Sequence, residues 1–280
     1  MRTHEAIHFI IQKLIESFGE REAKSLSRII LEDGFDLQYP FMDVSIDEFK
    51  LEDILKNILR GIPVQYVLGK TNFYGFDLKV NENVLIPRPE TEELLFYVFE
   101  HFHQKNTALK ILDIGTGSAC IPVVLKSKFP NAEITALDIS GDALDVARHN
   151  VENHKLTGVE FLELDFLDRS NWSLLSGDWD LIISNPPYIP DSESSVMGDS
   201  TLKYEPHTAL FTKDDKGQEF YIAIAEFAKK YLKKDGVVFC ELNEFWSETT
   251  RSYFKAATFQ SVSCIKDMQG KNRILKATFS

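Results

Sequence analysis

The chain has few cysteines and no long apolar run. Its three cysteines, Cys120, Cys240 and Cys264, lie far apart in 280 residues. They predict neither a disulfide framework nor a zinc site, and they fit a reducing cytoplasm. No apolar run approaches the length that spans a membrane. The first twenty residues mix His, Glu, Gln and Lys into their apolar positions, unlike a signal peptide. We therefore expect a cytoplasmic protein with no membrane association and no metal site.

Positive charge is also scarce. There are 31 Lys and Arg residues against 43 Asp and Glu, a formal net charge of -12. Dividing the chain at residue 90 leaves both parts acidic, with 11 basic against 15 acidic residues and then 20 against 28. A protein that grips duplex nucleic acid normally carries a basic face. The charge therefore argues against direct nucleic-acid binding.

The first ninety residues predict helices followed by a β-hairpin. An apolar stripe at helical spacing begins at Ile7, and Gly34 is expected to end a second helix. Ser45-Ile46-Asp47-Glu48 has the spacing of a capping box and starts a further helix, which stops at Gly61-Ile62-Pro63. The stretch "FYGFDLKVNENVLIP" alternates weakly in polarity around Asn81-Glu82-Asn83, which predicts a hairpin with its turn there.

From about residue 108, short apolar runs alternate with helical stretches. This rhythm is typical of βαβ units, so we predict an α/β fold with a mainly parallel sheet and helices on both faces. Ligands bind such sheets at the carboxyl ends of the strands. The predicted strands are 109–114, 132–139, 159–164, 179–184 and 236–242, with helices notably at 142–154 and 217–233.

Three features at predicted strand ends indicate a nucleoside-bearing cofactor. A glycine turn, "GTGSA" at 115–119, follows the first strand, and glycines there let the backbone approach a ligand closely. Asp138 ends the second strand, where a carboxylate can accept hydrogen bonds from ribose hydroxyls or can instead start the next helix. Phe166 follows the third strand and could stack on adenine or belong to the core. NAD and S-adenosylmethionine both fit these features.

The fourth strand ends at Asn185-Pro186-Pro187-Tyr188, which favours S-adenosylmethionine. A planar NH2 group is a poor nucleophile, and a site can help it by accepting both N–H bonds and fixing the nitrogen. The Asn185 side-chain oxygen and the Pro186 carbonyl supply two such acceptors, whose effect grows with the charge on nitrogen. The prolines stiffen the loop, and Tyr188 offers a flat wall. A simple turn that ends a strand is the alternative.

With these motifs the sequence resembles the PrmC/HemK family, the release factor glutamine methyltransferases, over nearly its whole length. The resemblance rests on "PVQYVLGKTNFYGFDLKVNENVLIPRPETEELL" (63–95), "DIGTGSACI" (113–121), "ALDIS" (136–140), "SNPPYIP" (184–190) and "YEPHTALF" (204–211), with weaker matches at 217–221 and 269–275. It implies methylation, by S-adenosylmethionine, of the glutamine side chain at N5 in the Gly-Gly-Gln loop of class 1 peptide chain release factors. These release factors are the expected partners.

The resemblance also implies an organisation and a set of site residues. A helical N-terminal substrate-recognition domain would span 1–62, a β-hairpin linker 63–90 and a Rossmann-like methyltransferase domain 91–280. A monomer is expected. Arg88 and Glu90 would line the same cleft, or simply start a helix with Pro89. The cofactor would contact Gly115, Thr116, Gly117, Ser118, Ala119, Asp138, Phe166 and Asn185; the substrate would contact Phe73, Asn185, Pro186, Pro187 and Tyr188; and Asn185, Pro186 and Tyr188 would be catalytic.

The sequence departs from the family pattern at three places. Ala119 stands where a third glycine is usual, which is tolerable if its backbone conformation is an ordinary one. "ELNEFWSE" (241–248) differs from the usual loop after the fifth strand, and Gln218 replaces a usual Leu. The alternatives are an amino methyltransferase that acts on a nucleic-acid base, at adenine N6 or guanine N2, another protein glutamine methyltransferase, a cofactor-binding module without catalysis and a nicotinamide dehydrogenase.

Overall fold

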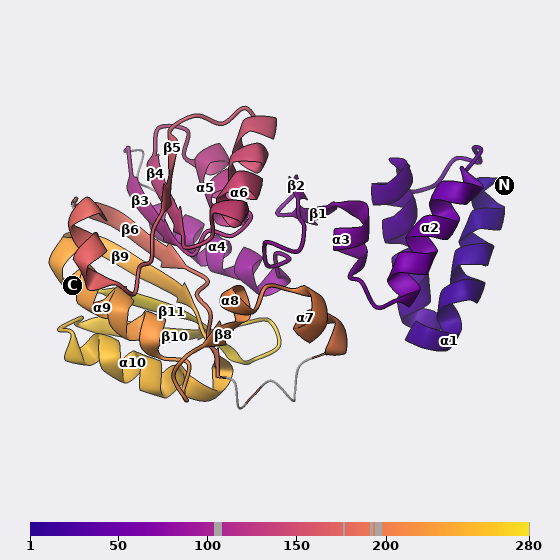
Figure 1. Cartoon of the computed structure of the whole chain (residues 1–280). Helices are drawn as coiled ribbons and strands as arrows, with labels where there is room; N and C mark the ends of the chain where they lie inside the picture. The colour runs from indigo at the N-terminus through magenta and orange to yellow at the C-terminus, as the bar shows by residue number, and fades with distance from the viewer. Residues whose placement is uncertain (104–107, 176, 191–192, 194–197, 280) are drawn as a thin grey trace.

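The structure is a computed structural model of the chain that describes residues 1–103, 108–175, 177–190, 193 and 198–279. An all-helical part lies at the N-terminal end, and an α/β part built on one large sheet lies beside it (Figure 1). A short helix and a two-stranded hairpin lie between the two parts (Figure 1). The predicted α/β fold with preceding helices is confirmed, while the boundaries at residues 62 and 90 stay predictions.

The N-terminal helices pack around an apolar core of their own. α1 (Thr3–Ile29) is interrupted at Gly19, whose φ of 76° and ψ of 164° are not helical, and η1 (Ile30–Gly34) continues it. α2 (Glu48–Leu59) and α3 (Val64–Leu68) follow. The side chains of Ile10, Leu14 and Leu51 are fully buried in this core. Burial of each side chain contributes about 1.5–3 kcal/mol of hydrophobic free energy. The helices bury these apolar faces against one another and not against the sheet.

The start of α2 corrects the predicted capping residue. The N-cap is Asp47, whose carboxylate accepts a hydrogen bond from the backbone N–H of Lys50 at 3.2 Å. Ser45, the predicted cap, instead forms an isolated antiparallel bridge with Arg2. Asp and Ser cap helices about equally well, so residue preference alone does not choose between Asp47 and Ser45. The bridge to Arg2 engages Ser45, and Asp47 caps the helix.

The hairpin turns earlier than predicted. β1 (Lys70–Phe73) pairs antiparallel with β2 (Phe76–Lys79), so the turn lies at Tyr74-Gly75 and not at Asn81-Glu82-Asn83. Both turn residues have positive φ, 50° and 83°, as a two-residue hairpin turn requires. The predicted turn exists as a separate one, closed by a bond from the Val84 N–H to the Asn81 carbonyl at 3.1 Å.

The central sheet has seven strands in the order β10-β11-β9-β6-β3-β4-β5. β3, β4, β5, β6 and β9 run parallel, and β11 is antiparallel to both of its neighbours. The chain leaves β3 toward β4 and β5 and then returns to the other side of β3, so loops diverge between β3 and β6. The five predicted strands are present as β3 (Lys110–Ile114), β4 (Glu133–Asp138), β5 (Val159–Glu163), β6 (Trp179–Ser184) and β9 (Leu232–Glu241); β10 (Ser261–Lys266) and β11 (Asn272–Thr278) were not predicted.

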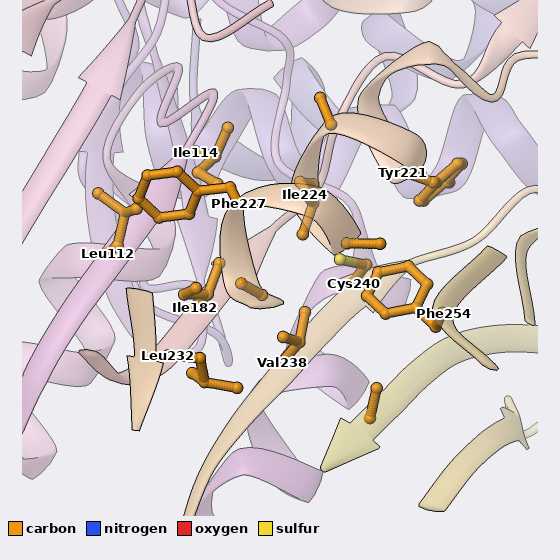
Figure 2. Close-up of a cluster of buried hydrophobic side chains, with 14 of the residues drawn as sticks. Leu112, Ile114, Ile182, Tyr221, Ile224, Phe227, Leu232, Val238, Cys240 and Phe254 are labelled. Atoms are coloured by element: carbon orange, nitrogen blue, oxygen red, sulfur yellow. The ribbon is translucent and has the colours of Figure 1, made fainter. Parts of the chain in front are cut away.

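Helices cover both faces of the sheet because successive side chains of a strand point to opposite faces. Leu112 of β3 packs with α9 (Glu219–Tyr231) and α10 (Ser247–Ala256), whereas Ile111 packs with α4 (Pro89–Phe102), α5 (Cys120–Lys128) and α6 (Gly141–Asn153). Figure 2 shows the first of these cores, where Phe227 and Ile224 of α9 lie against strand residues such as Ile182.

Short elements complete the α/β part. α7 (Asp199–Tyr204) lies against the end of α2, because the Ser200 hydroxyl donates to the Gly61 carbonyl at 2.8 Å and the Tyr204 hydroxyl donates to the Arg60 carbonyl at 2.9 Å. The others are η2 (Arg169–Leu175), β7 (Ile189–Pro190), α8 (His207–Leu210), β8 (Phe211–Thr212) and η4 (Glu244–Trp246). Within the described ranges, no helix is both long enough and apolar enough to cross a membrane.

Candidate active site

A cavity of about 240 Å³ opens at the carboxyl ends of β3, β4, β5 and β6. Its position follows from the strand order, since ligands bind parallel sheets where loops diverge from neighbouring strands. The described residues that line it include 83–85, 115–118, 137–140 and 164–167, with Thr91, Asn185, Pro187, Thr208 and Ala209. The cavity therefore brings together the three strand ends that the sequence singled out for a cofactor and the fourth strand end with its Asn.

The glycine loop leaves open space above its backbone. Gly115 and Gly117 have φ of 75° and 53°, in the left-handed region that favours glycine. A side-chain carbon at either position would meet no heavy atom within 4 Å. The backbone N–H groups of Gly115 and Thr116 both donate to the Leu137 carbonyl at 2.9 Å, which anchors the loop to β4. The loop is thus fixed in place while its outer side stays free for a ligand.

Ala119 departs from the ordinary backbone conformation expected for it. Its φ of 59° and ψ of 29° are left-handed, and it is the N-cap of α5. Its methyl group is fully buried in the core between the sheet and α4, α5 and α6. The expectation that an ordinary conformation makes Ala tolerable here is therefore wrong, and the residue carries a left-handed turn that costs about 1–2 kcal/mol.

Buried polar atoms beside the glycine loop fit the amino-acid end of S-adenosylmethionine. Within the described structure, both carboxylate oxygens of Asp113 and the hydroxyls of Thr116 and Ser118 are buried without a hydrogen-bond partner. Buried polar groups are normally satisfied. Burial raises the pKa of Asp113 to about 7. Thr116 and Ser118 line the cavity, so a ligand that carries an ammonium group and a carboxylate can supply partners for their two hydroxyls.

Asp138 performs both of the roles that the sequence left open. Its carboxylate accepts a hydrogen bond from the Gly117 N–H at 2.9 Å and one from the Ser140 N–H at 3.0 Å, which orders the glycine loop and the start of α6. Asp138 also lines the cavity. Burial raises its pKa. A carboxylate has about four acceptor positions, so these backbone hydrogen bonds leave acceptor capacity for a ribose hydroxyl.

Phe166 likewise belongs to the core and lines the cavity. Its ring is 2% exposed and lies 5.7 Å from the ring centre of Trp172 and 5.4 Å from that of Phe227. It also forms part of the cavity wall, next to Asp165. An aromatic side chain held on one side by two other rings is a rigid surface on which a base can stack.

Asn185 and Pro187 line the cavity directly after β6, and Pro186 between them is buried. The side-chain amide of Asn185 donates from Nδ2 to the Thr91 hydroxyl at 3.1 Å. Thr91 is in the first turn of α4 and lines the same cavity. The structure therefore brings the predicted acceptor Asn185 next to the glycine loop, and it adds a hydroxyl partner that the sequence did not indicate.

Tyr188 lies outside the lining of the cavity. Its hydroxyl donates to the Glu241 carboxylate at 3.1 Å, and burial raises the pKa of Tyr188 well above its usual value. Glu241 ends β9, is 1% exposed, and also accepts a hydrogen bond from the Thr91 hydroxyl at 2.7 Å. Neither Thr91 nor Glu241 was predicted from the sequence as a site residue. A signal was present, because Glu241 is a carboxylate at the carboxyl end of a parallel strand.

Phe73, Arg88 and Glu90 are not in the described wall of this cavity. Phe73 is 1% exposed and packs in the core on the α4 face, so the structure places it in the interior and not over the site. Arg88 forms an ion pair with Glu205, which is buried and also accepts a hydrogen bond from the Ile86 N–H at 3.2 Å. Glu90 is in the first turn of α4. In this geometry Arg88 and Glu90 match the simpler alternative of a helix start.

The described residues contain no group of three or more His, Cys, Asp or Glu side chains that could hold a metal ion. The polar groups at the cavity are carboxylates, hydroxyls, the amides of Asn83 and Asn185 and the ammonium group of Lys213, gathered around an apolar wall. Such a site binds an organic ligand through hydrogen bonds and a stacking surface.

Comparison with known proteins gives a consistent result. The family model described as "Methyltransferase small domain" matches residues 93–203. The chain is 36% identical to the release factor glutamine methyltransferase of Flavobacterium psychrophilum over 278 residues, which is 96% of each chain. It is 39% identical to the enzyme of that name from Streptococcus pneumoniae, covering 92% of this chain and 89% of the other. The enzyme of that name from Bacteroides thetaiotaomicron is 35% identical, over 96% and 97%.

Solved structures share the fold at lower identity. The catalytic domain of human Mettl16, in complex with a MAT2A 3′UTR hairpin, superposes with a TM-score of 0.60 at 14% identity, covering 91% of this chain and 92% of the other. The Thermus thermophilus 16S rRNA N2 G1207 methyltransferase, in complex with AdoMet and guanosine, gives 0.54 at 17% identity, covering 75% and 50%. These two likenesses concern the fold alone.

Proposed function

Because this chain belongs to the release factor glutamine methyltransferase family, we propose that it methylates the N5 atom of a glutamine side chain with S-adenosylmethionine as methyl donor. The glutamine is the one in the Gly-Gly-Gln loop of class 1 peptide chain release factors, which are its protein substrates. Relatives that carry this name and match nearly the whole chain support the proposal.

The observation that carries the chemistry is the position of Asn185. Its amide lies at the carboxyl end of β6 and lines the same cavity as 115–118 and Asp138. A planar NH2 group that enters from the Asn185 side therefore approaches a ligand held by the glycine loop. The paired acceptors on that side would be the Asn185 Oδ1 atom and the Pro186 carbonyl.

S-adenosylmethionine, when bound, supplies an electrophilic methyl group on a positively charged sulfur. Gly115, Thr116, Gly117 and Ser118 would hold its amino-acid end, Asp138 its ribose hydroxyls and Phe166 its adenine. Ala119 lies behind this loop in the core and would support it. The unpartnered hydroxyls of Thr116 and Ser118, the open space over the two glycines and the place of Asp138 in the cavity wall support this assignment.

Asn185 and Pro186 would bind the substrate NH2 group and align its nitrogen with the methyl group. Positive charge grows on this nitrogen as it gains the methyl group and before it loses a proton. Two acceptors fixed beforehand stabilise that charge more in the transition state than in the ground state. Pro187 completes the wall beside Asn185, and Tyr188 would stabilise the loop through its bond to Glu241.

We also propose where the enzyme works and how it meets its partner. Release factors act with the ribosome, so the cytoplasm is its expected location. The helices of residues 1–62 would recognise the release factor. The protein is expected to be monomeric, and its charge of -12 supports a protein partner with a basic surface over direct nucleic-acid binding.

The deciding experiment is incubation with labelled S-adenosylmethionine and three acceptors: a purified release factor, its variant with the glutamine substituted, and duplex DNA. Label should enter only the release factor that retains its glutamine. Asn185→Ala should lower kcat by about 100-fold or more while S-adenosylmethionine binding, measured by calorimetry, largely survives. Label on DNA with none on the release factor, or full activity of the variant, would refute the proposal.

A further inference from the structure

The amide of Asn185 can take two orientations of nearly equal shape, and only one of them serves the reaction. With Oδ1 toward the cavity, Asn185 accepts a hydrogen bond from the substrate NH2 group. With Nδ2 toward the cavity, two donors face each other and the substrate is repelled. Something in the site must therefore select the first orientation.

The Thr91 hydroxyl makes that selection because it has only one hydrogen. Its Oγ1 atom lies 2.7 Å from the Glu241 Oε2 atom and 3.1 Å from the Asn185 Nδ2 atom. An ionised carboxylate has no hydrogen to donate. Thr91 must therefore donate to Glu241 and can only accept from Asn185, so the NH2 group of Asn185 faces Thr91. The Oδ1 atom of Asn185 is then left for the cavity.

Glu241 is built into the structure as an acceptor. Its side chain is buried, and each carboxylate oxygen receives one hydrogen bond, from Thr91 on one side and from the Tyr188 hydroxyl on the other. The Tyr221 hydroxyl donates to the Glu241 backbone carbonyl at 2.8 Å and fixes this end of β9. Arg273 of β11 carries the positive charge that acts on the Glu241 carboxylate, while burial opposes its ionisation. These contacts hold the carboxylate in one position.

We propose that Thr91 and Glu241 are positioning residues for methyl transfer: the Glu241 carboxylate sets the direction of the hydrogen bonds through Thr91, and this direction holds the Asn185 oxygen toward the substrate NH2 group. The same carboxylate anchors Tyr188 and thereby the loop that carries Asn185. The inference rests on the proposed function and gives a role to Thr91 of the "IPRPETE" stretch and to Glu241 of the divergent "ELNEFWSE" stretch.

Loss of Thr91 and loss of Glu241 both remove the selection of the Asn185 orientation, and loss of Glu241 also releases the Tyr188 hydroxyl. Without the Thr91 hydroxyl, no group fixes the Asn185 NH2 end. Without an ionised carboxylate, the Thr91 hydroxyl is free to donate to Asn185 and turn it around. Misorientation of one preorganised transition-state acceptor lowers kcat by about 10- to 100-fold.

The test compares Thr91→Val, which removes the hydroxyl at nearly constant volume, with Thr91→Ser, which keeps it. Steady-state kinetics with a release factor should show kcat reduced by about 10- to 100-fold in Thr91→Val, with S-adenosylmethionine affinity within about twofold of wild type. Thr91→Ser should recover kcat to within about threefold. Loss of cofactor affinity in place of kcat would contradict the inference.

A matched control is Thr250→Val in α10. Thr250 is 1% exposed and donates to the Gln218 side-chain carbonyl at 2.8 Å, so this change also removes one buried hydroxyl hydrogen bond. It should lower the melting temperature about as much as Thr91→Val and leave kcat unchanged. A similar fall of kcat in Thr250→Val would mean that Thr91 acts only on general stability.

The second arm is a double-mutant cycle with Glu241→Gln. Because Glu241 acts on the Asn185 orientation only through Thr91, Thr91→Val combined with Glu241→Gln should reduce kcat no further than Glu241→Gln alone. Additive losses would refute a shared route to Asn185. If the wild-type enzyme leaves the release factor unmethylated, the proposed function fails; if it methylates the factor and Thr91→Val does so equally fast, only this inference fails.

Discussion

Ala119 combines a left-handed backbone conformation with a fully buried side chain. Replacing it with Gly removes the left-handed cost of about 1–2 kcal/mol but loses about 0.8 kcal/mol of methyl burial and about 0.5–1 kcal/mol of backbone entropy. We expect Ala119→Gly to change the free energy of unfolding by less than about 1 kcal/mol. Urea denaturation measures this change.

Ala147 is the matched control for that prediction. It is fully buried in the same core but lies inside α6, where its backbone is helical. Ala147→Gly gains nothing from relieved strain and should lose about 2 kcal/mol. Equal losses at the two positions would show that the left-handed conformation at Ala119 carries no energetic cost.

Asp113 gives the protein a pH-dependent stability. Its pKa is raised by burial to about 7, whereas an unfolded chain has about 3.9. The folded state therefore keeps the Asp113 proton to higher pH than the unfolded chain does. The stability that Asp113 contributes is complete below about pH 4 and is lost as the pH rises toward 7. In the absence of cofactor, the free energy of unfolding of Asp113→Asn should rise relative to that of wild type by about 4 kcal/mol between pH 4 and 7.5.

Urea denaturation at several pH values tests this contribution. The difference in free energy of unfolding between wild type and Asp113→Asn should grow steadily between pH 4 and 7 and then level off. Asp178→Asn, at an exposed position, serves as the control. A difference that stays constant over this range would show that Asp113 does not titrate as its burial requires.

Residue types at strand ends could be predicted from the sequence, but their partners could not. Asp138 and Asn185 stand out because a polar residue that ends a buried strand of a parallel sheet faces the ligand side. In the sequence, nothing distinguishes Thr91 from an ordinary residue at the start of a helix. Its partner Glu241 lies 150 residues further along the chain. Only the packing of α4 on β9 brings the two together.

At the scale of elements, the segment after β8 supports the Asn185 loop through Gly217. Its φ is 63°, and a side-chain carbon there would overlap the Tyr188 carbonyl, whose carbon atom lies 2.9 Å away. Gly217→Ala should therefore displace the loop and lower kcat by about 10- to 100-fold with an intact fold. Kinetics with a release factor and circular dichroism measure the two quantities.

Gly177→Ala, before the other end of β6, is the control for Gly217→Ala. Its added carbon would make only ordinary contact with the Trp179 ring, at 3.8 Å. It should leave kcat unchanged. Unaltered activity in Gly217→Ala would mean that the close contact with Tyr188 has no influence on the reacting groups.

The sequence predicted the boundaries of the buried parallel strands well and those of other elements poorly. β3 and β6 were predicted nearly to the residue because each contains consecutive apolar residues, 111–112 and 181–183, of a buried strand. β10 and β11 mix polar and apolar residues along an edge of the sheet, so they carry little signal. The hairpin turn was misplaced because Asn81-Glu82-Asn83 has turn composition, although Tyr74-Gly75 makes the tighter turn.

At the scale of the whole molecule, hydrogen bonds distant in sequence join the N-terminal helices, the hairpin and the cavity wall. Asn150 of α6 is 1% exposed and bonds both to the Lys79 backbone of β2 and to the Ser118 carbonyl of the glycine loop. α7 bonds to the end of α2 and leads into Thr208 and Ala209 of the cavity wall. The helical part is thus connected to the cavity from two sides.

The order of the sheet also leaves two outer strands, β5 and β10, whose outer backbone groups have no neighbour in the sheet. Such edges can recruit a strand from a second molecule and start aggregation. On β5, Glu160 and Glu163 are exposed, and an antiparallel copy centred between them would place Glu160 of one chain opposite Glu163 of the other. Repulsion between these like charges disfavours pairing of β5 with a second copy of the chain, so this edge resists extension of the sheet from one molecule to the next.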